Sequence, residues 1–151
     1  MKGEEKLKKK VESSNLTQDF LFLKNIKHED IPAYINLMDI CVLPDMSIYS
    51  SPVKIFEYMA MAKPVILPSK GQPQQIFRHL ENCLFIEPRN QKQLVEAILL
   101  LERDENLREK LGRNAREKIS REFTWLRSAE KILKIYGNLQ KRGNLIPEVT
   151  I

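Results

Sequence analysis

Short runs of consecutive apolar residues alternate with helix-forming segments along this chain. The runs that are typical of strands lie at residues 20–23, 40–43, 65–67 and 84–86. Helical patterns separate them, and strands joined through helices pair in parallel, because parallel neighbours need a crossover connection. Each run is apolar throughout, which indicates a sheet covered on both faces. We therefore predict an α/β fold, with a Rossmann-like parallel sheet of about four strands, helices on both faces and a helical C-terminal third.

Several segments carry helical patterns with recognisable ends. They cover residues 3–14, 28–38, 51–63, 72–79, 91–103, 105–121 and 124–140. The third is expected to stop before Pro64, because the position before a proline disfavours the helical conformation. In the last segment the larger apolar side chains share one helix face and are expected to face inward. These are Trp125, Ala129, Ile132, Leu133 and Tyr136.

Length and composition favour one folded domain. The chain has 151 residues, of which 42% are hydrophobic and 30% charged, so it can form a core and remain soluble. We predict a single domain over residues 1–151. Cys41 and Cys83 lie within apolar runs, which predicts reduced core residues in a reducing compartment. No apolar run approaches the length of roughly 20 residues that spans a bilayer. We therefore predict a cytoplasmic protein.

The formal net charge of +5 restricts the class of ligand or partner. A basic surplus suits an anionic ligand, or peripheral contact with the acidic inner face of a membrane. The alternative is that the charges only solvate helix faces. The basic helices lack interleaved aromatic residues and any nucleic-acid-binding motif, so no nucleic acid partner is predicted.

Residues 51–57 form the helix start that is best suited to an anion. Ser51 can cap the helix with its hydroxyl, and Pro52 fits the first helical position. Lys54 lies in the first turn, where the helix dipole disfavours a cation, which indicates a negative group nearby. Glu57 follows one turn later. A phosphate and a hydroxylated sugar would suit this pair, although Lys54 and Glu57 as ordinary surface residues remain the alternative.

Several segments match, in order, those of one enzyme family. They are residues 31–44, SPVKIFEYMA at 51–60, KPVI at 63–66, and NAR at 114–116 followed by FTW at 123–125. The chain resembles the C-terminal, donor-binding domain of retaining GT-B glycosyltransferases of the family 4 type, also called glycosyl transferases group 1. The resemblance implies transfer of a sugar from a UDP- or GDP-sugar to an acceptor hydroxyl with retention, in polysaccharide or glycolipid biosynthesis.

The same resemblance implies roles for the residues around Glu57. In relatives, the matching glutamate binds the ribose hydroxyls, and the matching loop brings backbone N–H groups to the diphosphate. That loop holds Ser50, Ser51, Val53 and Lys54. Asn25 and Ile26 match a loop that lies against the base. No metal or other cofactor is implied, because the helix dipole and basic side chains would carry the charge of the leaving diphosphate.

Some positions depart from the family pattern. Tyr49 stands where relatives have the glutamate nearest the transferred sugar, so the catalytic residue is left unassigned. Asp45 lies four residues away from that register. Ala62 stands where the family commonly has glycine.

The family's first strand, its basic pair and its acceptor-binding domain have no counterpart in residues 1–151. The resemblance therefore implies a truncated GT-B C-terminal domain that is inactive alone and needs an acceptor-binding domain in cis or in trans. The alternative is a non-catalytic interaction module, or a subunit that pairs with a separate acceptor-binding chain. A sheet edge left open by the absent strand would also permit a homodimer.

Overall fold

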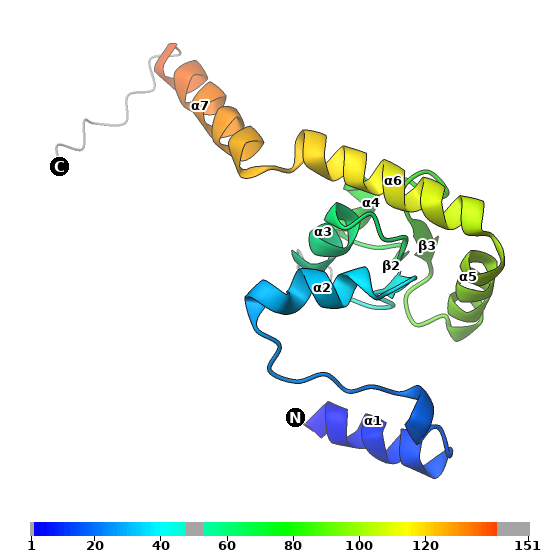
Figure 1. Ribbon diagram of the computed structural model, residues 1–151. Coiled ribbons are helices and arrows are strands. Elements are labelled where there is room, and N and C mark those ends of the chain that lie inside the picture. The colour runs from blue at the N-terminus through cyan, green and yellow to red at the C-terminus, as the bar shows by residue number, and fades with distance from the viewer. Residues whose placement is uncertain (1, 48–52, 142–151) are drawn as a thin grey trace. The chain divides into compact units, whose positions relative to one another are not determined.

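The computed structural model describes residues 2–47 and 53–141 (Figure 1). The chain divides into two units, residues 1–31 and residues 32–151. The prediction of a single domain over residues 1–151 stays a prediction.

The first unit contains α1 (Lys2–Ser13), followed by two short 3-10 turns, η1 (Thr17–Asp19) and η2 (His28–Asp30). Charged side chains tie the later part of this unit to α1. Glu4 forms ion pairs with Lys8 at 3.2 Å and with Lys24 at 3.1 Å. The ammonium of Lys8 also lies 5.2 Å from the ring centroid of Phe22. The helix predicted for residues 3–14 is thus confirmed within one residue at each end.

The strand predicted at residues 20–23 is wrong. This segment forms no strand, and the Leu21 side chain is 81% exposed. A strand needs a neighbour that accepts and donates the ladder hydrogen bonds, and no described residue pairs with this run in that way. Phe20 and Phe22 instead stack on each other, with ring centroids 6.3 Å apart. Their apolar character reflects this contact and not a place in the sheet.

The second unit is built on a parallel sheet. Its strands are β1 (Cys41–Val42), β2 (Val65–Pro68) and β3 (Leu84–Ile86), in the spatial order β1-β2-β3. Cys41 pairs with Val65, and Ile66 pairs with Leu84. The predicted α/β class and parallel pairing are confirmed. Within the described residues the sheet has three strands, where about four were predicted.

Helices connect the strands and complete the chain. They are α2 (Ile31–Asn36), α3 (Val53–Ala60), α4 (Gln72–Ile76), α5 (Gln91–Arg103), α6 (Glu105–Glu122) and α7 (Trp125–Lys141). Figure 1 shows α6 running past both α3 and α5, which it contacts. Side-chain caps define the starts of α5 and α6: Asn90 accepts from the Gln93 amide, and Asp104 accepts from the Leu107 amide. The predicted C-terminal helices agree within one residue.

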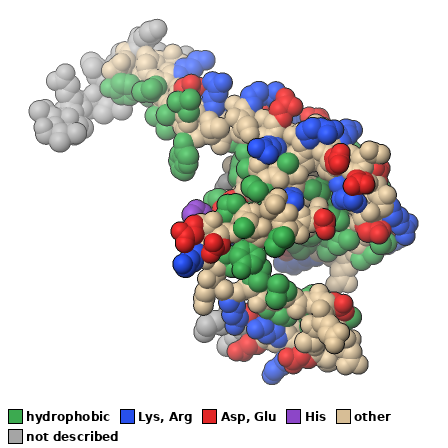
Figure 2. Space-filling view, in the orientation of Figure 1, with side chains coloured by type: hydrophobic (Ala, Val, Ile, Leu, Met, Phe, Trp, Pro, Cys, Tyr) green, Lys and Arg blue, Asp and Glu red, His purple; other side chains and the backbone are tan. Residues whose placement is uncertain are grey.

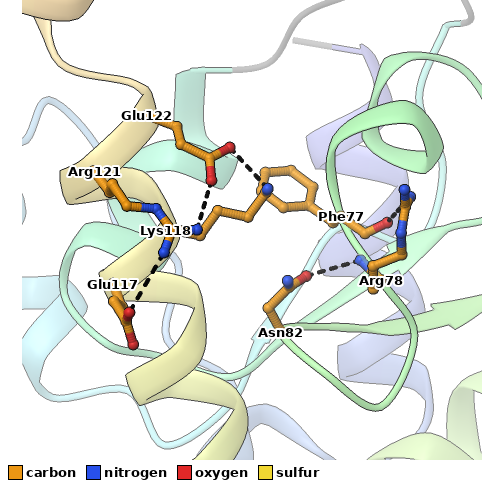
Figure 3. Close-up of polar contacts among 7 residues, drawn as sticks. All are labelled: Phe77, Arg78, Asn82, Glu117, Lys118, Arg121 and Glu122. Atoms are coloured by element: carbon orange, nitrogen blue, oxygen red, sulfur yellow. Dashed lines mark hydrogen bonds and ion pairs between the residues drawn. The ribbon is translucent and has the colours of Figure 1, made fainter.

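The core lies on both faces of β2, because successive strand residues point to opposite sides. Val65 and Leu67 join a cluster with α3 and the second half of α6. Ile66 joins a second cluster with β3, α5 and Leu111 of α6. Helices therefore cover both faces of the sheet, as the continuous apolar runs predicted. Asn82, a buried polar side chain, accepts a hydrogen bond from the Arg78 amide at 2.9 Å (Figure 3).

Both cysteines are buried, free thiols in the core beside β2. Burial raises the pKa of Cys41 to about 11 and that of Cys83 to about 12. Thiols with such pKa values stay protonated at neutral pH and are poor nucleophiles. The prediction that both cysteines lie in the core is confirmed, and the reducing compartment stays a prediction.

The turn at the end of α3 packs closely against α6. The Ala62 amide donates to the Met59 carbonyl and the Lys63 amide donates to the Tyr58 carbonyl, which is the Schellman pattern. Ala62 takes the left-handed position of that motif, with φ 56°. This geometry explains why glycine suits the position in the family. Gly112 of α6 packs on the same turn, since a Cβ there would lie 1.9 Å from the Ala62 carbonyl oxygen.

The inward face predicted for α7 is wrong. Trp125 is 92% exposed, and Ile132, Leu133 and Tyr136 are also exposed. Figure 2 shows hydrophobic side chains at the surface of the C-terminal helix. No side chain of residues 125–140 is buried. The spacing predicted the helix and its apolar face correctly. Spacing does not show whether another element covers that face, and none of the described elements covers the apolar face of α7. No helix in the described part of the chain is both long enough and apolar enough to cross a bilayer.

Candidate functional site

The predicted anion site lies at the start of α3. The structure describes this helix from Val53, so Tyr49, Ser50 and Ser51 lie outside the described residues. Val53 and Lys54 occupy the first turn and are exposed. Glu57 follows three positions after Lys54, and residues at that spacing share one face of a helix. The described part of the site therefore places a cation and a carboxylate on the same face of α3, one turn apart.

The carboxylate of Glu57 is available to a ligand. The side chain is half-buried, and among residues 2–47 and 53–141 it has no hydrogen-bond or ion-pair partner. An ionised carboxylate is an acceptor only, with two oxygens that can each receive donors. Glu57 can therefore accept a pair of hydroxyl groups without first giving up a contact within the described protein.

Packing holds α3 firmly against the sheet. Ile55 and Met59, on the face opposite Glu57, are 1% and 0% exposed and belong to the core. Phe56 contacts Phe77 and Phe123, with ring centroids 6.2 and 5.4 Å apart. A side chain on such a packed helix keeps a defined position, which is what recognition of a ligand requires.

Charged side chains follow each strand at the carboxyl edge of the sheet. Asp45 follows β1, Lys70 follows β2 and Arg89 follows β3. Lys70 Nζ lies 2.5 Å from Asp45 Oδ1, and Arg89 Nε lies 2.9 Å from Asp45 Oδ2. These two cations, Lys70 foremost, lower the pKa of Asp45 to about 2. In open parallel sheets ligands bind beyond this edge.

The charged group at the strand ends was missed by the sequence analysis. Asp45 was considered there only for its distance from the register of the first family glutamate. The structure shows both of its carboxylate oxygens engaged by cations, which makes it poorly suited to act as a base. A charge shortly after each of the predicted strands was the available signal. That signal becomes readable once the strands are known to be parallel neighbours.

Asn25 and Ile26 lie in the first unit, whereas Glu57 lies in the second. Asn25 is exposed and has a φ of 53°, in the left-handed region that asparagine tolerates better than most residues. Ile26 is half-buried. Contact of Asn25 and Ile26 with a nucleotide base stays a prediction.

Hollows of the described surface lie over the C-terminal helices. One lies between the end of α5 and the start of α6, lined by Leu99, Leu100 and Arg103 among others. Another lies on α6, beside Arg113 and Arg116. Neither is lined by Lys54 or Glu57. In the described ranges, no group of three or more histidine, cysteine or acidic residues could hold a metal ion, and the prediction that none is needed stays a prediction.

Comparison of the sequence with known proteins identifies its family. A family model described as Glycosyl transferases group 1 matches residues 1–118. An uncharacterized glycosyltransferase from Methanocaldococcus jannaschii is 30% identical over 146 residues, which cover 91% of this chain and 39% of that protein. The chain therefore spans about two fifths of the length of this relative.

Solved structures agree with the fold. Sucrose-phosphate synthase from Thermosynechococcus elongatus superposes with a TM-score of 0.80 at 27% identity, over 91% of this chain and 34% of that one. HepE from Anabaena, in complex with UDP, superposes with a TM-score of 0.82 at 20% identity, over 89% of this chain and 36% of that one. These proteins are GT-B glycosyltransferases, which confirms the predicted fold. With the family model matching residues 1–118 of 151, the chain belongs to the glycosyl transferases group 1 family.

Proposed function

We propose that this chain binds the nucleotide-diphosphate-sugar donor of a glycosyltransferase of the retaining, family 4 type. The sugar would pass from a UDP- or GDP-sugar to an acceptor hydroxyl. The observation that carries the proposal is the pair of Lys54 and Glu57 on one face of α3, with the Glu57 carboxylate free of partners among the described residues.

Two comparisons support a nucleotide sugar as the ligand. The Anabaena neighbour is known in complex with UDP and with UDP-glucose. The M. jannaschii relative, at 30% identity over most of this chain, carries the description of a glycosyltransferase. Both observations concern other proteins. They make UDP the first nucleotide to test on this one.

The chemistry of the proposed site follows from its charges. The carboxylate oxygens of Glu57 accept charge-assisted hydrogen bonds from the two ribose hydroxyls. The positive end of the α3 dipole and the Lys54 ammonium stabilise the diphosphate, which gains negative charge as the sugar leaves. The proposal assigns this role to protein groups and needs no metal ion.

Catalysis would depend on an acceptor-binding domain. The chain spans 39% or less of the lengths of the relatives compared above, and the acceptor hydroxyl must be held against the donor sugar for transfer to proceed. We propose that this domain is supplied in cis or in trans, and that the chain alone binds donor but turns over slowly. A homodimer through a sheet edge, and contact with the inner face of a membrane, remain predictions.

Thermal unfolding with nucleotides tests the proposal. At a concentration of about 100 times its Kd, a ligand stabilises the folded state by about 2.7 kcal/mol, so UDP or GDP should raise Tm by about 5 °C or more. Glu57→Ala removes hydrogen bonds to a charged group and should weaken nucleoside diphosphate binding roughly 10- to 100-fold.

The matched control is Glu109→Ala. Glu109 is an exposed glutamate on α6, outside the proposed site, and its variant should bind nucleotide as the wild-type chain does. Absence of a Tm change with every nucleoside diphosphate, including UDP and GDP, would count against the proposed function.

A further inference from the structure

The group formed by Asp45, Lys70 and Arg89 joins loops that are distant in sequence but adjacent in space. The three residues follow β1, β2 and β3, which are neighbours in the parallel sheet. Their side chains meet at the carboxyl edge, with Asp45 between the two cations. In open parallel sheets ligands bind beyond this edge, which is where the group lies.

Asp45 is held in one orientation by three donors. Oδ1 accepts from the Lys70 ammonium and from the Met46 amide at 2.8 Å, and Oδ2 accepts from Arg89 Nε. The Asp45 and Lys70 side chains are only 31% and 25% exposed, whereas the Arg89 side chain is 85% exposed. The inner pair is therefore fixed, and the arginine extends from it into solvent.

The charges of this group do not cancel. One carboxylate faces two cations, which leaves one positive charge in excess within this group of three. A single cation would have been enough to neutralise Asp45. An exposed ion pair such as that of Arg89 adds at most about 1 kcal/mol to stability. The excess positive charge therefore has little value for the fold alone.

The backbone of Arg89 is strained. Its φ is 63°, in the left-handed region that residues with a side chain generally avoid. Such a conformation costs roughly 1–2 kcal/mol and persists only where the surrounding structure or a function maintains it. Here the strained residue is the one that carries the exposed cation.

Both cations keep donors that Asp45 does not use. Arg89 bonds to Asp45 through Nε, and among the described residues its terminal amino groups have no other partner. The Lys70 ammonium has three hydrogens and gives one to Asp45. Phosphate oxygens suit these donors, because the guanidinium fork matches two of them and the ammonium acts as a point charge.

We propose that Lys70 and Arg89 form a cationic subsite for the diphosphate of the nucleotide sugar, with Asp45 as the positioning residue that holds both. This inference rests on the proposed function and deepens it. The ribose is held on α3 by Glu57. The diphosphate lies at the start of α3 beside Lys54 and is also held at the strand ends by side chains from two other loops. No bond is made or broken in this step.

Calorimetric titration of the full chain with UDP, UMP and uridine tests the subsite. Arg89→Gln and Lys70→Gln should each weaken UDP binding about 10-fold, the size of one charge-assisted contact, and leave uridine binding unchanged. Arg89→Lys keeps the charge and should recover part of the loss. Arg103→Gln is the matched control: Arg103 is an exposed arginine with its Nε beside Glu102, away from the strand ends, and should have no effect.

The outcomes separate this inference from the proposed function. If UDP binds and Glu57→Ala weakens it, but Arg89→Gln and Lys70→Gln bind UDP like the wild-type chain, the subsite is refuted and the proposed function stands. If the wild-type chain binds no UDP or GDP, both are refuted. Equal losses for UDP and uridine would indicate damage to the fold, and would also refute a diphosphate subsite. Thermal unfolding of each variant without ligand checks the fold directly.

Discussion

The two C-terminal helices are alike in length and differ in what they contact. α6 has 18 residues and α7 has 17, and both alternate apolar and charged positions at helical spacing. α6 buries Leu111, Gly112, Ala115 and Ile119 against the sheet and α3. No side chain of residues 125–140 in α7 is buried. The same kind of pattern thus gives a packed helix in one case and an uncovered one in the other.

The difference lies in the size of the contacting residues and in the surface opposite them. Gly112 lets α6 approach the turn at Ala62 closely, so that backbone touches backbone, and Ala115 is a small side chain buried in the core. α7 offers large side chains such as Trp125 and Leu133, and the described residues present no surface that covers them. A helical pattern therefore predicts where a helix exists and which face is apolar. It does not say whether a partner surface is present.

The largest expected change in stability comes from Gly112→Ala in α6, and Gly137→Ala in α7 is its matched variant. In Gly112→Ala the new Cβ would lie 1.9 Å from a backbone oxygen, so α6 must shift, at a cost of about 3 kcal/mol or more. In Gly137→Ala the Cβ meets nothing within 4 Å, and α7 should gain about 1 kcal/mol in helix propensity.

Urea unfolding followed by circular dichroism measures both variants. The midpoint should fall clearly for Gly112→Ala and should not fall for Gly137→Ala. Similar losses in the two variants would show that α7 is packed as closely as α6, and the comparison between the helices would fail.

The fold could be predicted because the apolar runs at residues 40–43, 65–67 and 84–86 record burial on both sides. Each run is apolar throughout, which indicates a buried strand, and helical segments separate the runs, which indicates crossover connections and hence parallel pairing. The run at residues 20–23 is also apolar throughout and forms no strand. Pairing depends on a neighbour elsewhere in the chain, and local composition carries no information about that neighbour.

The candidate site could be predicted only in part, for a similar reason. Lys54 and Glu57 lie on one helix, so their spacing alone fixes their relation. Asp45, Lys70 and Arg89 come together through the order of the strands, which no single segment contains. Contacts within one element can be read from the sequence, whereas contacts between loops require the topology.

A smaller change in stability should come from glycine at position 62, in the turn on which α6 packs. Ala62 has a φ of 56°, where a Cβ is unfavourable, so Ala62→Gly should stabilise the chain by about 1 kcal/mol and raise Tm by a few degrees. The matched variant is Ala129→Gly in the second turn of α7, where glycine costs about 1 kcal/mol of local helix stability. Opposite signs are expected, the second visible as a loss of helical circular dichroism. A lower Tm for Ala62→Gly would contradict the Schellman geometry at the end of α3.

The smallest effect concerns the charges at the end of α6. Glu122 lies 2.7 Å from Arg121 and 2.9 Å from Lys118 (Figure 3), and these cations, Arg121 foremost, lower the pKa of Glu122 from 4.5 to about 2. A lowered pKa means that the ionised form is favoured by folding. The stabilisation is therefore complete above pH 4.5 and is lost as the pH falls toward 2.

Glu122→Gln should consequently have a slightly lower Tm than the wild-type chain at pH 7, and the difference should disappear near pH 2. In α7, Arg127 and Glu130 form a comparable exposed pair at 2.8 Å. Because that helix buries no side chain over residues 125–140, Glu130→Gln should leave the main unfolding transition unchanged at pH 7. Scanning calorimetry at both pH values measures the two variants. A Tm difference between the wild-type chain and Glu122→Gln that stays constant from pH 7 to pH 2 would mean that Glu122 does not stabilise the fold through its ion pairs.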